Sequence, residues 1–193
     1  MKTRIFMTVF CCIMACTAFA QKQKYVLTAG EQQDIQKAAV DKVNRFQSSC
    51  AAIAGKKYSV AQKTKFIETT LLDFQENAQI TVTSFNGKAD KPKPVKNYLE
   101  KLSMLGKRYA NIKVTWCNCY ISNEFEYDAN SGMYVGWAKV EQHFNALTWE
   151  RIYVGDVVER TVKVYAQLKE VFDKNDVRKK WVIKLGDISA RNI

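Results

Sequence analysis

The feature of this 193-residue chain that most constrains its fold is a change of pattern at Tyr109. Before Tyr109, apolar side chains recur every three or four positions, the spacing that gives a helix one apolar face. After it, the helical spacing is replaced by runs rich in Val, Ile, Tyr, Trp and Thr, which are favoured in strands. Helices followed by an antiparallel meander predict an α+β domain in which helices cover one face of a sheet.

Three helices are predicted in the first half of the chain. Residues 28–31 and 59–62 are capping boxes, in which a hydroxyl residue and a Glu or Gln three positions later cap a helix start. The first helix is predicted to end near Gly55. The third begins at Pro94, whose fixed φ suits a first helical turn, and is closed by Gly106. The second carries an apolar stripe of Phe66, Ile67, Leu71 and Phe74.

The strands are predicted from alternation and from turn residues. A short strand at residues 78–85 ends at an Asn-Gly pair and lies between the second and third helices. The β-rich runs are residues 109–122, residues 124–127 joined by a turn to 133–147, residues 161–172 and residues 181–189. Residues 149–159 form a connection of undefined structure, and residues 173–180 form the turn before the last strand.

The N-terminus has the pattern of a secretory signal peptide over residues 1–20: basic residues, an apolar segment and an Ala-Phe-Ala site ending at Ala20. Cleavage there predicts an exported protein, periplasmic or extracellular, with no transmembrane span afterwards and a single domain over residues 21–193. The alternative is a lipoprotein, because residues 13–16 resemble a lipobox that ends at Cys16.

Three cysteines remain after this cleavage: Cys50, Cys117 and Cys119. An odd number permits at most one intramolecular disulfide. Cys50 could pair with either strand cysteine, and the spacing does not choose between them. The interpretation we favour is that the cysteines are buried free thiols. A Cys-x-Cys pair with a single histidine in the chain lacks the second ligand pair of a structural zinc site. The sequence therefore predicts no metal and no cofactor.

Residues 132–144, 161–165 and 181–188 resemble the strands of secreted Bacteroidetes-type domains of the nuclear-transport-factor-2-like superfamily. The resemblance extends over residues 59–189. It implies a cone, in which three N-terminal helices pack on a strongly curved antiparallel sheet of four long strands and a short one, around a pocket. Members of the superfamily include ketosteroid isomerases, polyketide cyclases, dehydratases and binding modules, and their catalytic Asp or Asp-His sets do not map onto this sequence.

The best catalytic pair in the sequence is Glu141 and His143, which lie two residues apart on one predicted strand and so share a face. Trp137 and Lys139 share that face too, which favours a solvated surface over an acid/base pair. Three acids near the ends of predicted elements are further candidates: Asp73, Glu76 and Asp187.

Aromatic side chains in the β-rich half are candidates for the lining of a ligand pocket: Trp116, Tyr120, Trp137 and Tyr165. The formal net charge of +11 suits an anionic envelope surface or an acidic partner, while nucleic acid is a poor match because no single-strand stacking motif is present.

The leading hypothesis is an exported, non-enzymatic binding or accessory domain with a concave pocket, whose partner is a small molecule or a protein, with homodimerisation as an option. The alternative is a small-molecule isomerase, cyclase or hydrolase that uses Glu141 with His143, or Asp73, inside the cone. A third possibility is a structural subunit of an envelope or secretion complex.

Overall fold

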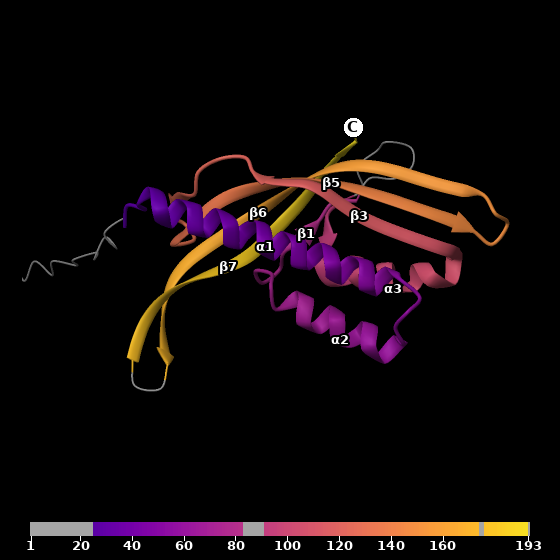
Figure 1. Cartoon of the computed structure of the whole chain (residues 1–193), viewed down its shortest axis with the longest axis horizontal. Helices are drawn as coiled ribbons and strands as arrows, with labels where there is room; N and C mark the ends of the chain where they lie inside the picture. The colour runs from indigo at the N-terminus through magenta and orange to yellow at the C-terminus, as the bar shows by residue number, and fades with distance from the viewer. Residues whose placement is uncertain (1–24, 83–90, 174–175, 193) are drawn as a thin grey trace, which may run out of the picture.

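The computed structural model describes residues 25–82, 91–173 and 176–192, and within them three helices pack on one face of a curved sheet (Figure 1). The α+β cone predicted from the sequence is confirmed. The helices are α1 (Ala29–Ala54), α2 (Val60–Leu71) and α3 (Val95–Arg108). The strands are β1 (Gln79–Ile80), β2 (Lys93–Pro94), β3 (Tyr109–Ile121), β4 (Glu126–Asp128), β5 (Met133–Thr148), β6 (Tyr153–Asp173) and β7 (Asp176–Asn192).

The sheet has the strand order β2-β1-β7-β6-β5-β3, and β4 pairs with β5. All pairs of neighbouring strands are antiparallel except β1 with β7, which makes the sheet mixed. The four long strands, β3, β5, β6 and β7, are neighbours in chain order and form a meander. The short strands β1 and β2 come earlier in the chain but lie at the β7 edge of the sheet. Those two short strands return the chain from α2 to α3 beside the end of β7.

Both predicted capping boxes are present at the helix starts. Thr28 and Glu31 exchange hydrogen bonds at the start of α1, and Ser59 and Gln62 do so at the start of α2. Pro94 is the N-cap of α3 and makes no side-chain capping bond. The predicted end of α3 at Gly106 is wrong, because the helix continues to Arg108, immediately before β3 begins.

Several predicted boundaries in the second half are corrected by the sheet. The predicted connection over residues 149–159 is strand from Tyr153 onward, because its backbone pairs with β5 as far as the Leu147–Tyr153 pair. The predicted turn over residues 173–180 is strand from Asp176, paired with the end of β6. In both cases cross-strand pairing carries the strand through residues that interrupt the apolar pattern, Gly155 with Asp156 in the first and Arg178 to Lys180 in the second.

The core lies between the helices and the concave face of the sheet. Phe46 of α1 is 1% exposed and packs edge-on against Phe74 and Trp116, with ring centroids 5.1 and 5.3 Å away. Phe74 was expected on the second helix but lies beyond its end, where it pairs with Leu185 of β7. This aromatic cluster packs α1, the segment that follows α2, and β3 of the sheet against one another.

The three cysteines predicted to survive cleavage are free thiols, so the disulfide alternative is not realised. Cys50 is fully buried on α1, Cys119 is half-buried and Cys117 is exposed. The favoured interpretation of buried thiols therefore holds fully only for Cys50.

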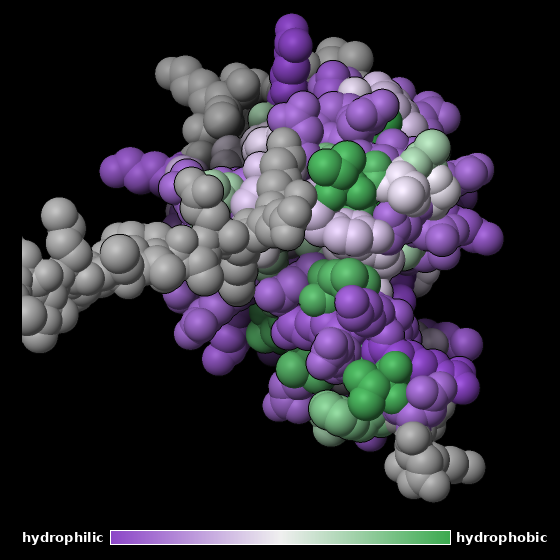
Figure 2. Space-filling model, turned by 90° about the vertical axis from the view of Figure 1, so that its left-hand side faces the viewer, coloured by the Kyte–Doolittle hydropathy of each residue, from purple (hydrophilic) through white to green (hydrophobic). Residues whose placement is uncertain are grey.

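The far end of the β6–β7 hairpin projects beyond the helices (Figure 1). Its described residues combine exposed apolar side chains with a basic flank: Val171, Phe172, Val177, Arg178, Lys179 and Lys180. Seen from this end of the molecule, apolar groups form separate patches within a mostly hydrophilic surface (Figure 2).

Some sequence predictions fall outside the described residues. These are the signal peptide over residues 1–20 with its alternative at Cys16, and the part of the predicted strand from Thr83 onward. Within the described ranges, no helix combines the length and the apolar character needed to cross a bilayer.

Candidate functional site

A cavity of about 330 Å³ lies between α3 and the concave face of the sheet. This volume is at the lower end of the roughly 300–1,000 Å³ of small-molecule sites. Its described lining is mostly apolar, with a few polar groups: Val82, Lys93, Tyr98, Lys101, Leu102, Leu105, Gln142, Phe144, Asp156, Val158 and Arg160.

The lining follows from the two side-chain periods of helix and strand. Its α3 members are spaced three, one and three residues apart from Tyr98 to Leu105, which places them on one helical face. Its sheet members are alternate residues of β5 and β6, which point to the same side. The register pairs Gln142 with Val158, and Phe144 with Asp156, so this wall is one continuous patch of two paired strands.

Arg160 is the most unusual residue of the cavity, because its charged side chain is only 3% exposed. Its Nε donates a hydrogen bond to Gln142 Oε1, and its Nη1 donates to the Thr81 carbonyl at 3.0 Å. The guanidinium also lies 6.0 Å from the ring centroid of Tyr98 and 5.9 Å from that of Trp116, within cation–π range. No carboxylate in the described ranges forms an ion pair with it.

Burial without a carboxylate partner makes this guanidinium attractive to an anion. A buried charge is costly unless a counter-charge or hydrogen bonds compensate it. Carbonyl groups and ring faces supply part of that compensation here. A ligand carboxylate that entered the cavity would supply the rest.

Tyr98 shows how strongly this region is shielded from water. Burial raises the pKa of its phenol to about 12, although the nearby Arg160 and a hydrogen bond from Gln142 act in the opposite direction. Burial likewise raises the pKa of the Cys50 thiol. Both groups are therefore neutral at physiological pH, and Tyr98 can offer a hydroxyl to a ligand.

The charge of the described lining is positive. Lys93, Lys101 and Arg160 are basic, and Asp156 is the only acid among the lining residues that the structure describes. With Lys101 and Arg160 against Asp156, the field of these described residues favours a ligand that carries negative charge.

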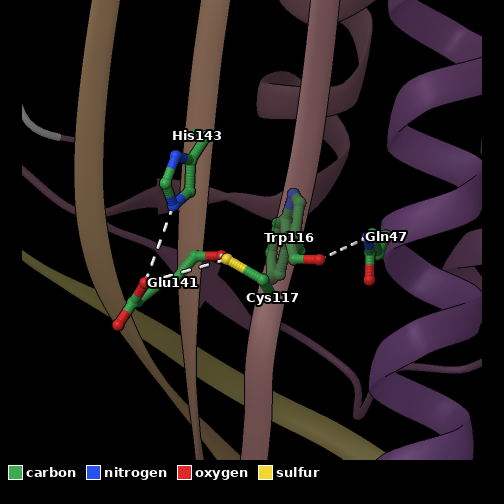
Figure 3. A network of polar contacts seen from close by, with 5 residues as sticks. All are labelled: Gln47, Trp116, Cys117, Glu141 and His143. Carbon is green, nitrogen blue, oxygen red and sulfur yellow. Dashed lines mark hydrogen bonds and ion pairs between the residues drawn. The ribbon is translucent and has the colours of Figure 1, made fainter.

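The predicted pair Glu141 and His143 lies on the other face of the sheet from the cavity. His143 Nε2 is 3.6 Å from Glu141 Oε2, and both side chains are 36% exposed. Cys117 of β3 is directly opposite Glu141 in the register, and its Sγ is 3.7 Å from the same carboxylate oxygen. Figure 3 shows these three side chains on the side of the sheet away from α1.

The carboxylate of Glu141 is held ionised by its neighbours. Its pKa is lowered mainly by a hydrogen bond from Asn118, with smaller contributions from His143 and Cys117. The pKa of the Cys117 thiol is raised, first by desolvation and then by the negative charge of Glu141. The pair therefore lies on the outer face of the sheet, as strand alternation predicts, and Cys117 is a third member of the group.

The other candidate acids serve structural contacts. Asp73 forms an ion pair with Lys42 of α1 at 2.6 Å, where the two side chains are 17% and 15% exposed. Asp187 accepts a hydrogen bond from the Gln79 backbone N–H at 2.8 Å, which supports the β1–β7 junction. Neither acid lines the cavity, nor does Glu76, which lies beside the segment that follows α2.

The four aromatic candidates divide between the core and the outer face. Trp116 is 5% exposed and contributes its ring to the surroundings of Arg160, although it does not line the cavity itself. Tyr120 is exposed, and Trp137 and Tyr165 lie on the outer face of neighbouring strands, where Lys163 contacts both of their rings.

Sequence reasoning missed Arg160, Gln142 and Tyr98 as site residues. For Arg160, the sequence does contain a pattern that could have identified it. Arg160 is in phase with the apolar residues Val158 and Val162 of the same strand, so a charged side chain faces the core side of the sheet. The predicted strand began one residue later, which hid this phase relation.

The comparisons with known proteins add little to this geometry. No protein-family model matches the sequence, and no curated protein matches it significantly. The solved structures of similar fold include the following two. A provisionally named scytalone dehydratase from Novosphingobium aromaticivorans is 9% identical with a TM-score of 0.45, covering 85% of this chain and 88% of its own. A protein from Kribbella flavida is 10% identical with a TM-score of 0.45, covering 83% and 92%. Likenesses at this level do not bear on activity.

Proposed function

We propose that this chain is an exported binding protein whose cone pocket takes a small apolar molecule carrying one anionic group. The observation that carries the proposal is Arg160, which is buried at the wall of a mostly apolar cavity without a carboxylate partner among the described residues. An arginine fork binds a carboxylate through charge-assisted hydrogen bonds, and the apolar lining favours the rest of the ligand.

The arrangement of the cavity supports binding more than acid/base catalysis. Glu141, His143 and Asp73, the residues that the enzymatic alternative requires, do not line it. The resemblance of the sequence to the nuclear-transport-factor-2-like superfamily is part of the proposal, since binding modules with a pocket of this kind occur there. Export rests on the signal-peptide pattern of residues 1–20.

The proposal is tested with two fluorescent probes of similar size. 8-Anilinonaphthalene-1-sulfonate is an apolar anion, and N-phenyl-1-naphthylamine is its uncharged analogue. We expect the native protein to bind the anion more tightly than the neutral probe. Replacing Arg160→Gln is expected to weaken binding of the anion by about 10- to 100-fold, because a hydrogen bond to a charged group contributes about 1.5–3 kcal/mol.

Two further variants make the test decisive. Arg178→Gln removes the same charge from the exposed hairpin and is the control for net charge, so it should leave the affinity unchanged. Leu105→Trp enlarges a half-buried side chain that lines the cavity and should reduce binding of both probes. Equal affinity for the two probes, or equal losses in Arg160→Gln and Arg178→Gln, would refute the assignment.

A further inference from the structure

The outer face of the sheet brings together three metal-ligating side chains that the cavity does not use. Cys117, Glu141 and His143 each offer one ligand atom, and these three atoms lie within 4.8 Å of one another. One carboxylate oxygen of Glu141 is central to the group, 3.7 Å from Cys117 Sγ and 3.6 Å from His143 Nε2. Figure 3 shows the three side chains converging from β3 and β5.

The sheet itself fixes this convergence. Cys117 is directly opposite Glu141 in the antiparallel register, and His143 follows Glu141 by two residues on the same face. The register of β3 against β5 shifts immediately after Cys117, where Asn118 has a φ of 55°. This bulge places the Asn118 side chain where it hydrogen-bonds Glu141, as residues beside metal ligands commonly do.

One nitrogen of this group makes no hydrogen bond to the described residues. His143 Nε2 is shielded from solvent and has no hydrogen-bond partner among the described residues, since Glu141 lies just beyond hydrogen-bond distance. An imidazole nitrogen in this state, beside a thiol and a carboxylate, is a ready metal ligand.

We propose that Cys117, Glu141 and His143 form a mononuclear zinc-binding site with an open fourth position. Thiolate, imidazole and carboxylate are all zinc ligands, and three protein ligands leave one position for water. Zinc–ligand bonds of about 2.0–2.3 Å in a tetrahedron separate ligand atoms by about 3.3–3.6 Å. Two of the separations already approach this value, and side-chain rotation closes the third.

The sequence pattern alone led away from this site. The Cys-x-Cys pattern predicts no metal site because it lacks a second ligand pair, whereas the fold brings Cys117, without Cys119, beside two ligands of the neighbouring strand. Cys119 is two residues further along, beyond the bulge, and is absent from the group of converging ligands. It therefore provides a matched control.

The test uses the full chain without a histidine tag, because His143 is its only histidine. Titration with zinc chloride by calorimetry should give one ion bound per chain. Cobalt(II) should produce a sulfur-to-metal charge-transfer band, which reports thiolate ligation directly in the native protein. Cys117→Ser should abolish the band, whereas Cys119→Ser should retain it.

His143→Gln and Glu141→Gln should each lower zinc affinity by more than about 100-fold, the upper range for loss of a residue that only supports a ligand. Because these side chains are half-buried on the outer face and lie outside the core between helices and sheet, the variants should keep the urea-unfolding midpoint close to that of the native protein. The proposal is overturned if the native protein gives no charge-transfer band, if the band survives in Cys117→Ser, or if Cys119→Ser loses it. The probe-binding experiments on the cavity are unaffected by either result, since the two sites occupy opposite faces of the sheet.

Discussion

The buried phenol of Tyr98 makes the stability of this protein sensitive to alkaline pH. In the folded chain, burial raises the pKa of this group from 10.0 to about 12. Below about pH 10 both the folded and unfolded states hold the proton, and the full contribution to stability is present. Between pH 10 and 12 the unfolded chain loses the proton while the folded chain keeps it, so stability falls as the pH rises.

The size of the effect follows from the shift. One pKa unit corresponds to about 1.4 kcal/mol, so the rise from 10.0 to about 12 predicts a loss of about 3 kcal/mol once the pH exceeds both pKa values, of which about 2 kcal/mol is lost by pH 12. Urea unfolding of the native protein and of Tyr98→Phe, followed by tryptophan fluorescence from about pH 9 upward, isolates this group. The native protein should lose about 2 kcal/mol more than the variant by pH 12.

Two other variants separate Tyr98 from its surroundings. Tyr120→Phe removes an exposed phenol and should follow the native curve. Cys50→Ala removes the buried thiol, whose pKa is also raised by burial. This variant should lose less stability with rising pH than the native protein, and the difference should begin near pH 9, where the thiol of the unfolded chain loses its proton. If Tyr98→Phe and the native protein lose stability in parallel, Tyr98 is accessible to water and the shielding of the cavity wall is refuted.

Two further predictions concern packing and charge. Gly136→Ala should destabilise the fold by about 1–3 kcal/mol, because an added Cβ would lie 2.8 Å from the ring of the buried Phe125. The control is Gly30→Ala on α1, where an added Cβ meets open space and the variant should be neutral or more stable by up to about 1 kcal/mol. Thermal unfolding of both variants distinguishes a steric effect from a general effect of replacing glycine. A double-mutant cycle with Lys42→Met and Asp73→Asn should give a coupling of about 1 kcal/mol, and additive losses would show that this ion pair contributes nothing.

The order of elements was predictable because it depends on local pattern. Both capping boxes and the starts of α1, α2 and β3 follow from residue spacing that needs no tertiary contact. The starts of β6 and β7 were not predictable in this way. Residues 153–160 and 176–180 are strand because each pairs with a neighbouring strand, although Gly155 with Asp156 and Arg178 to Lys180 interrupt the apolar pattern of the local sequence.

The candidate sites were harder to predict for a related reason. The outward direction of Glu141 and His143 follows from strand alternation, but the approach of Cys117 depends on the β3–β5 register and on the bulge after it. The cavity depends on the distance between α3 and the sheet, which no single segment determines. Arg160 and Gln142 are polar residues in phase with the apolar residues of their strands, which is a sequence signal of an unusual buried environment.

The projecting β6–β7 hairpin is a suitable place to attach the protein to a surface for measurements on the cavity. β6 continues from Arg160 at the cavity wall to Phe172, which is 80% exposed, a span of about 40 Å at about 3.3 Å per residue. A chemical tether or immobilisation tag attached at Phe172 is therefore remote from the guanidinium while remaining on the same continuous strand. The molecule can be fixed to a sensor surface by this end with its pocket left open to solution.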